Sequence, residues 1–405
     1  MKRICISVFL FFLSLMAFCQ SDEDILNSNI DDLFSQVDDI EVPVIEEKPA
    51  PAGFQSVPLT FSGSLTTDLG IGYIWNKDSS NKKNGYFAFD NYIFFSAFPI
   101  SNAGVRGTVK TSFPDFNFNL YELYLDYLLL DKIYITAGKK ETCWGYVRIF
   151  TTSEDDEEKE LKNKLSFETN ILSDSRNGMS IQARIPFWTG TITGIALYNG
   201  NNSEPGLRDM SYAGSLEMTI LNTSLNFFGR MFPEKKSPQA PENNGLKVGS
   251  EIKKSLFGAD FYVQFLSQFS NNQYAKDLVK KFDFSKESFG DVVYTAGFYR
   301  LWDEFDPQIG INIEFQDDYA PLENFHQRRV AVDGGIKRLG PHKNIKIGME
   351  WIHSITDKDG YLKSGLIVSG VAPWVDWDTG VKFEYENGTV SKITAGTYLR
   401  FNINY

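Results

Sequence analysis

The sequence predicts an all-β protein: a transmembrane, antiparallel, up-and-down β-barrel of about eighteen strands, with sixteen as the alternative count. Three observations carry this prediction. Apolar and polar residues alternate along almost the whole chain from Leu59 onward, which puts them on opposite faces of strands. The predicted connections alternate between short and long, and the seven tryptophans fall near the ends of the predicted strands.

The start of the chain has the composition of a secretory signal peptide. A short positively charged start is followed by an almost wholly apolar run at 4–18. Ala17 and Cys19 are the small residues at positions −3 and −1 of a cut after Cys19. An alternative is lipidation of Cys19 at a motif similar to a bacterial lipobox, in which Phe18 is bulky. We therefore expect residues 1–19 to direct export.

Cysteine content and charge exclude several classes of protein. Cys143 is the one cysteine left in the mature chain, so neither an intramolecular disulfide nor a cysteine-based zinc site can form. No later stretch approaches the roughly 18 apolar residues of a membrane-spanning helix. The formal net charge of −12 becomes −14 without Lys2 and Arg3, which argues against nucleic acid as a partner.

Residues 20–58 form an acidic arm with ten carboxylates and one lysine. Its apolar residues are spaced four and three apart, as on one face of a short helix: Leu26, Ile30, Leu33, Val37 and Ile40. Two heptads are too few for a helix that stands alone in water. Two interpretations stay open, namely a periplasmic helix for trimerisation or docking and a frayed acidic leader. The prolines that follow predict a stiff linker up to residue 58.

Eighteen alternating runs follow the arm, and an even count suits a closed bacterial barrel with both ends on the periplasmic side. The runs are 59–75, 86–98, 103–112, 118–130, 133–149, 178–187, 191–199, 208–220, 223–232, 246–256, 259–268, 291–302, 308–317, 328–339, 345–354, 362–371, 375–385 and 391–405. We therefore expect the barrel to occupy residues 59–405.

The connections are tight from even to odd runs and mostly longer and polar from odd to even runs. This is the asymmetry between periplasmic turns and extracellular loops in outer-membrane barrels. The tryptophans near the run ends suit the aromatic girdles at the two water–lipid boundaries: Trp75, Trp144, Trp188, Trp302, Trp351, Trp374 and Trp377.

If the apolar face meets lipid, the polar face lines the interior of the barrel. Its charged residues are the candidate pore-lining set: Arg106, Lys110, Glu122, Asp126, Arg184, Lys247, Glu251, Lys253, Glu314, Arg329, Asp333, Lys337, Lys346, Glu350, Asp376, Asp378, Lys382, Glu384 and Arg400. So many charged side chains cannot all be buried away from water, because an unpaired buried charge costs several kcal/mol. We expect a watery interior, and about sixteen or more strands leave room for a channel.

The longest connection, 150–177, is the candidate constriction. Ser153 suits a helix N-cap, and the acidic residues behind it suit the first turn of a short helix: Glu154, Asp155, Asp156, Glu157, Glu158 and Glu160. Placed inside the pore, these carboxylates predict a preference for cations. The alternative is a solvated acidic loop at the cell surface.

The chain resembles the large outer-membrane porins. Ala137-Gly138-Lys139-Lys140, Trp144-Gly145 and the stretch 169–174 before Gly178 are similar to substrate-specific porins of the alginate-export and phosphate-selective type. The resemblance implies an outer-membrane channel for passive or selective uptake of small hydrophilic solutes, whose loop after the fifth strand narrows the pore. It also implies that the C-terminal strand is read by the barrel assembly machinery through Leu399, Phe401, Ile403 and Tyr405. A homotrimer is left open.

An enzyme is not expected, and neither a cofactor nor a metal is implied. The three histidines lie in a turn, a loop and a strand, and adjacent His353 and Ser354 point to opposite faces of their strand. Two alternatives to a porin remain. A hydrophobic-substrate transporter of the fatty-acid type would have fewer strands and an apolar pocket, and the aromatic residues on the polar face favour it: Tyr92, Phe94, Phe228 and Phe232. A surface adhesin built on a barrel would bind through its long loops.

Overall fold

The computed structural model describes residues 59–77, 79–113, 117–140, 142, 144–145, 147–150, 179–198, 210–231, 246–268, 292–320 and 324–404. All regular elements in these ranges are β-strands. None of the described residues belongs to a helix long and apolar enough to cross a membrane. The predicted signal peptide, the acidic arm with its predicted helix, and the six acidic residues of the candidate constriction lie outside the described residues.

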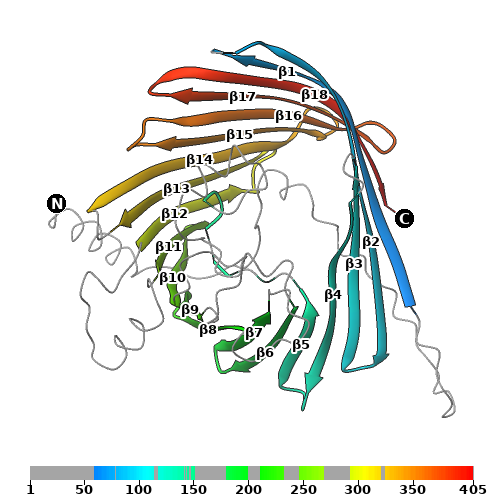
Figure 1. The fold of residues 1–405 in the computed structure, drawn as a ribbon, viewed down its shortest axis with the longest axis vertical. Coiled ribbons are helices and arrows are strands. Elements are labelled where there is room, and N and C mark those ends of the chain that lie inside the picture. Colours follow the sequence, from blue (N-terminus) through cyan, green and yellow to red (C-terminus); the bar gives the residue numbers. More distant parts are fainter. Residues whose placement is uncertain are drawn as a thin grey trace.

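Eighteen antiparallel strands form one sheet, and each strand pairs with its neighbours in the chain. The first and last strands also pair, which closes an up-and-down barrel and confirms the predicted fold class and strand count (Figure 1). The strands are β1 (Leu59–Asn76), β2 (Lys82–Ile100), β3 (Ala103–Phe113), β4 (Asn117–Leu129), β5 (Ile133–Lys139), β6 (Met179–Phe187), β7 (Gly190–Tyr198), β8 (Ser211–Ile220), β9 (Thr223–Met231), β10 (Leu246–Leu256), β11 (Ala259–Gln268), β12 (Val292–Trp302), β13 (Gln308–Ala320), β14 (Phe325–Leu339), β15 (Ile345–Ser354), β16 (Gly360–Ala372), β17 (Val375–Glu386) and β18 (Thr389–Asn404).

The wall of the barrel has one polar and one apolar face, because directly opposed residues of neighbouring strands share a face. At the seam between β1 and β18, Asp68 lies opposite Arg400, and both line an interior cavity. Large apolar side chains occupy the outer face, and Ile71 on β1 is 70% exposed there. This is the distribution expected of a barrel that faces lipid outside and water inside.

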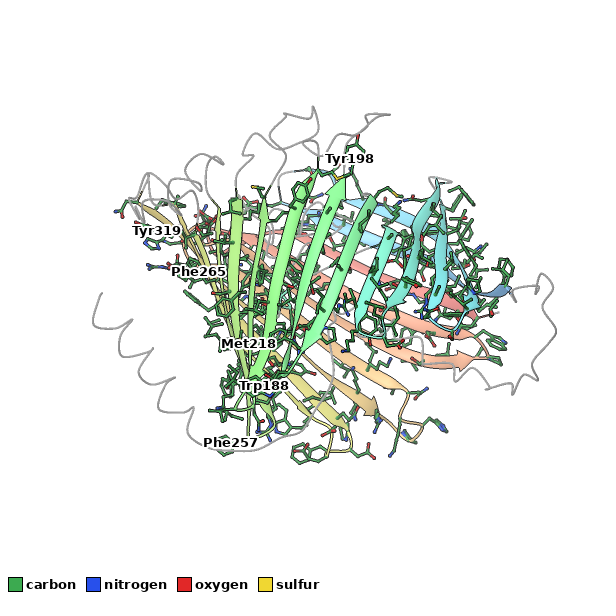
Figure 2. All side chains as sticks on the ribbon, turned by 90° about the horizontal axis from the view of Figure 1, so that it is seen from below. Trp188, Tyr198, Met218, Phe257, Phe265 and Tyr319 are labelled. Atoms are coloured by element: carbon green, nitrogen blue, oxygen red, sulfur yellow. The ribbon has the colours of Figure 1, made fainter. Side chains whose placement is uncertain are left out.

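The connections at one end of the barrel are short, and we call it the short-turn end. Its connections include 130–132, 188–189, 221–222, 257–258 and 373–374. Figure 2 shows Trp188 and Phe257 at this end of the strands, with Tyr198 and Tyr319 at the opposite end. The predicted sorting of connection lengths holds for most of the chain. An exception is the β17–β18 connection, which has only two residues, 387–388, at the long-loop end.

Five turns at the short-turn end place a large apolar residue at a positive φ angle. They are Leu130 (φ 53°), Trp188 (φ 32°), Leu221 (φ 50°), Phe257 (φ 55°) and Trp374 (φ 67°). Hairpin turns usually place Asn, Asp or Gly in this conformation, because other residues are strained there. These five side chains are exposed, with Trp188 96% exposed, so packing within the described chain does not explain them.

The predicted fifth run, 133–149, is too long. β5 ends at Lys139, and the chain then leaves the wall. Gly138 has a φ of 134°, and a Cβ there would lie 2.3 Å from the carbonyl oxygen of Leu123. The apolar residues Trp144, Val147 and Ile149 of the predicted run pack inside the barrel instead of continuing a strand, as described below. The other strand ends lie within four residues of their predicted positions.

Candidate functional site in the barrel interior

The cross-strand register places all nineteen candidate pore-lining residues on the interior face of the wall. For example, Glu122 on β4 lies opposite Thr108, and Asp126 lies opposite Thr136 on β5. The same face continues through Asp333 on β14, which lies opposite Glu350 on β15. The structure therefore brings these residues to one surface, and their role in conduction stays a prediction.

An interior cavity of about 680 Å³ lies between β1, β2 and β12–β18. Six of the candidate residues line it: Asp333, Lys337, Lys346, Asp378, Lys382 and Arg400. Asp68 and Lys363 also line it and were missing from the predicted set. Both lie on the polar side of an alternating run, so the same alternation could have found them. In total, three carboxylates and five cationic side chains line the cavity, which makes its wall net basic.

Charged and polar pairs link neighbouring strands on the interior face of β17, β18 and β1. The guanidinium of Arg400 donates to the carboxylate of Asp68 through Nε at 2.9 Å and Nη2 at 3.3 Å. The hydroxyl of Tyr398 donates to Asp378 on β17. Glu384 contacts Lys382 at 3.4 Å and Lys392 at 3.7 Å. These contacts hold several interior charges in fixed positions along the wall of the cavity.

The chain that leaves β5 returns to the wall at Glu314 on β13. The carboxylate of Glu314 accepts hydrogen bonds from the backbone N–H groups of Arg148 at 2.6 Å, Ile149 at 2.9 Å and Phe150 at 3.0 Å. The hydroxyl of Tyr262 on β11 donates to the same carboxylate. Hydrogen bonds to a charged acceptor are the strong ones, and they satisfy a carboxylate that is fully buried.

Two apolar clusters hold the same stretch of chain inside the barrel. Val147, Ile149 and Phe150 pack with side chains of β14, β15 and β16: Ala331, Ile352 and Tyr361. Trp144 packs against Phe228 on β9, with ring centroids 6.1 Å apart. We call residues 144–150 the crossing segment, since it contacts the interior walls of β9 and of β13–β16. Trp144 is thus inside the barrel, and its predicted place in an aromatic girdle is wrong.

The charged end of Arg148 completes the contacts of the crossing segment. Its guanidinium lies 3.8 Å from the centre of the Tyr299 ring on β12, and 3.9 Å from the carboxylate of Asp260 on β11. Lys253 on β10 contacts the same carboxylate at 3.1 Å. Backbone, apolar and charged contacts therefore all fix the position of this segment on the interior wall.

The prediction that the charged side chains of the interior cannot be buried away from water is wrong for part of the wall. Glu251, Glu314, Glu350 and Arg230 are buried. Their burial is possible because polar neighbours compensate most of them: Asn226 and Gln264 donate to Glu251, and Tyr361 donates to Glu350. An acceptor surrounded by donors avoids most of the cost of a buried unpaired charge. The watery part of the interior is therefore narrower than the barrel itself.

The remaining predicted site residues are placed only in part. Leu399, Phe401 and Ile403 lie on the outer face of β18, opposite Leu69, Thr67 and Leu65 of β1, while Tyr405 lies outside the described residues. Of the aromatic residues that favoured a hydrophobic-substrate transporter, Phe228 is covered by Trp144. Phe232 lies outside the described ranges. Within the described chain, no group of His, Cys, Asp and Glu side chains could hold a metal ion.

Comparisons with known proteins show the fold. The sequence matches no protein-family model and no curated protein. Among solved structures, OccK11 (OpdR) of Pseudomonas aeruginosa matches with a TM-score of 0.53 and 8% identity over 85% of this chain and 96% of that chain. OccK3 (OpdO) of the same organism matches with a TM-score of 0.52 and 10% identity, over 85% and 96%.

The outer membrane protein OpdK, also of Pseudomonas aeruginosa, matches with a TM-score of 0.50 and 7% identity, over 85% of this chain and 99% of that chain. The same protein has been solved with vanillate. At such identities the likeness extends to the fold alone. It agrees with the broader resemblance, to an outer-membrane β-barrel, and the narrower resemblance to the alginate-export and phosphate-selective type stays a prediction.

Proposed function

We propose that this chain is an outer-membrane porin of a diderm bacterium, which lets small hydrophilic solutes pass through a pore narrowed by the loop after β5. The closed eighteen-stranded barrel with an apolar outer face suits the membrane. The interior cavity with its charged wall suits polar solutes. Eighteen strands also count against the transporter of the fatty-acid type, for which fewer strands are expected.

The observation that carries the proposal is the attachment of the crossing segment to Glu314. The three N–H groups held there belong to residues 148–150, where the predicted constriction loop 150–177 begins. A loop that starts from this point starts inside the barrel and not at its rim. This supports a loop that reduces the cross-section of the pore, as the resemblance to large porins implies.

Liposome swelling with sugars of graded size tests the proposed function. Purified full-length protein should admit small sugars and exclude larger ones, whereas an adhesin built on a closed barrel admits none. A planar bilayer with the same preparation should show stepwise ion currents. Swelling that is independent of the protein, together with absent currents from a correctly folded barrel, would overturn the proposal.

Two sets of charges are proposed to set ion selectivity. The cavity wall is net basic and favours anions, while the predicted carboxylates of the loop favour cations, as charged rings do in channels. Reversal potentials in a salt gradient separate the two contributions. Lys346→Gln with Lys363→Gln should shift the potential towards cation preference, and neutralising the six loop carboxylates should shift it towards anion preference. An unchanged potential in both variants would contradict selection by these charges.

We also propose that the chain forms a homotrimer and that the barrel assembly machinery recognises its C-terminal strand. Deleting Tyr405 should leave export across the inner membrane intact and block insertion of the barrel. A heat-modifiable, detergent-resistant barrel in that variant would contradict this role.

A further inference from the structure

A group of aromatic side chains lies on the interior face of β2 and β4, away from the contacts described above for the crossing segment. Tyr92 and Phe94 on β2 stack with ring centroids 6.3 Å apart and an interplanar angle of 7°. Tyr121 on β4 meets Tyr92 edge-on at 6.4 Å. Tyr86 on β2 is 52% exposed and lines the interior cavity. We call Tyr86, Tyr92, Phe94 and Tyr121 the aromatic track.

The register confirms that Tyr92 and Phe94 of the track face the interior. Tyr92 lies opposite Ser64 on β1 and Lys110 on β3, and Phe94 lies opposite Thr108 on β3. These residues share a face with the interior Asp68, since Ser64 and Asp68 are an even number of residues apart on the same strand. The rings of Tyr92, Phe94 and Tyr121 are half-buried, so part of each remains accessible.

Charged groups of both signs border the track. The ammonium of Lys110 lies 5.2 Å from the centre of the Tyr92 ring and 3.5 Å from the carboxylate of Asp90. Glu122 on β4 lies opposite Thr108, the residue that also faces Phe94. The track therefore combines flat apolar surface with hydrogen-bond donors and acceptors, and one cation and two carboxylates border it.

This combination narrows the class of ligand. A wholly apolar solute would cover Asp90, Glu122 and Lys110 without giving them hydrogen bonds, which is costly. A charged solute would compete with the contact between Lys110 and Asp90. A neutral sugar ring meets both demands, because its C–H face can lie on an aromatic ring, whose face is negative, and its hydroxyls can donate to carboxylates and accept from an ammonium.

We propose that the aromatic track binds the rings of neutral saccharides as they pass through the barrel. The proposal rests on the proposed function, since it names a class of solute for the same pore. Successive rings along β2 and β4 offer successive stacking positions, so a saccharide of several units gains more contacts than a single sugar. Binding is weak and reversible at each position, as passage requires.

Current block in planar bilayers measures this binding directly. Glucose, maltose and maltotriose added to full-length protein should reduce the ion current in a saturable way, with maltotriose bound most tightly. Tyr92→Ala should weaken maltotriose binding roughly three- to tenfold, the effect expected of one lost aromatic contact. Tyr92→Leu keeps the apolar volume and removes the flat ring, so it should weaken binding similarly even if Tyr92→Ala lowers the yield of folded barrel.

Phe87→Ala serves as the matched control. Phe87 lies on the same strand but on the outer face, where it is exposed, so its loss should leave maltotriose binding unchanged. Equal loss of binding in Phe87→Ala and Tyr92→Ala would show that the track has no specific role.

Failure of this proposal is distinguishable from failure of the proposed function. Open-channel current that no saccharide blocks would overturn saccharide binding and leave the porin intact. If the barrel conducts no ions, calorimetry of maltotriose binding to the detergent-solubilised protein still decides the question. Block by benzoate that Lys110→Gln abolishes, without block by maltotriose, would assign the track to aromatic carboxylates and overturn the proposal.

Discussion

The guanidinium of Arg400, four residues before the end of β18 at Asn404, donates to the carboxylate of Asp68 on β1 through two nitrogen atoms, 2.9 and 3.3 Å from its oxygens. The pair joins the strand that begins the barrel to the strand that completes it. Both side chains are partly shielded from solvent, so the pair is screened less than one on an open surface. Paired geometry of this kind adds direction as well as strength.

Arg400→Gln should lower the free energy of unfolding by about 1–3 kcal/mol, because it leaves the Asp68 carboxylate without its charged partner. The temperature at which the barrel changes mobility in a denaturing gel measures the effect. The double variant Asp68→Asn with Arg400→Gln should lose less than the sum of the two single variants. Additive losses would show that the two side chains do not stabilise one another.

Phe150→Ala should loosen the crossing segment while the barrel stays closed. Phe150 is fully buried against side chains of the interior wall, and such truncations cost about 3–5 kcal/mol. Hydrogen exchange of residues 147–150 should therefore become much faster, whereas exchange at the seam of β1 and β18 should not change. Equal exchange in the wild type and in Phe150→Ala would mean that this packing does not hold the segment.

At Leu221 we expect a substitution to raise stability or leave it unchanged, whereas the two substitutions above lower it. Its side chain is 87% exposed with φ at 50°, a conformation that costs a residue other than glycine about 1–2 kcal/mol. Leu221→Gly should therefore raise stability or leave it unchanged in detergent. The matched control is Asn387→Leu in the β17–β18 turn, where φ is 48° and a loss is expected. A large loss in Leu221→Gly would show that its exposed side chain makes a stabilising contact, such as one with lipid.

The strands were predictable because the outer face of the barrel wall contacts lipid and the inner face contacts water. Strict alternation, as in β18 with Tyr398 and Arg400 inside and Leu399 and Phe401 outside, follows from that condition and is visible in the sequence. The same condition located the charged interior wall. Strand boundaries followed as well, except where the chain leaves the wall after Lys139.

The crossing segment was not predictable for an equally physical reason. Val147 and Ile149 alternate with polar neighbours whether they continue a strand or pack inside the barrel, so the pattern is the same in both cases. The sequence predicted Glu314 as one of many solvated residues of the wall. Its partners at 148–150 lie 164–166 residues away in the chain, so no local pattern connects them. The positive φ angles of the large apolar turn residues were also not predicted, since turn preferences favour Asn and Gly in this conformation.

The central claim is that the crossing segment, held at Glu314, narrows the pore. Its most direct test is the single-channel conductance of Glu314→Ala and Glu314→Gln. Each hydrogen bond to the Glu314 carboxylate contributes about 1.5–3 kcal/mol, so its loss should release residues 148–150 and give larger, noisier currents. Glu384→Ala, which removes an interior carboxylate from Lys382 and Lys392 instead, should conduct like the wild type. Wild-type conductance in both Glu314 variants, from barrels that fold normally, would contradict a pore narrowed by the chain held at Glu314.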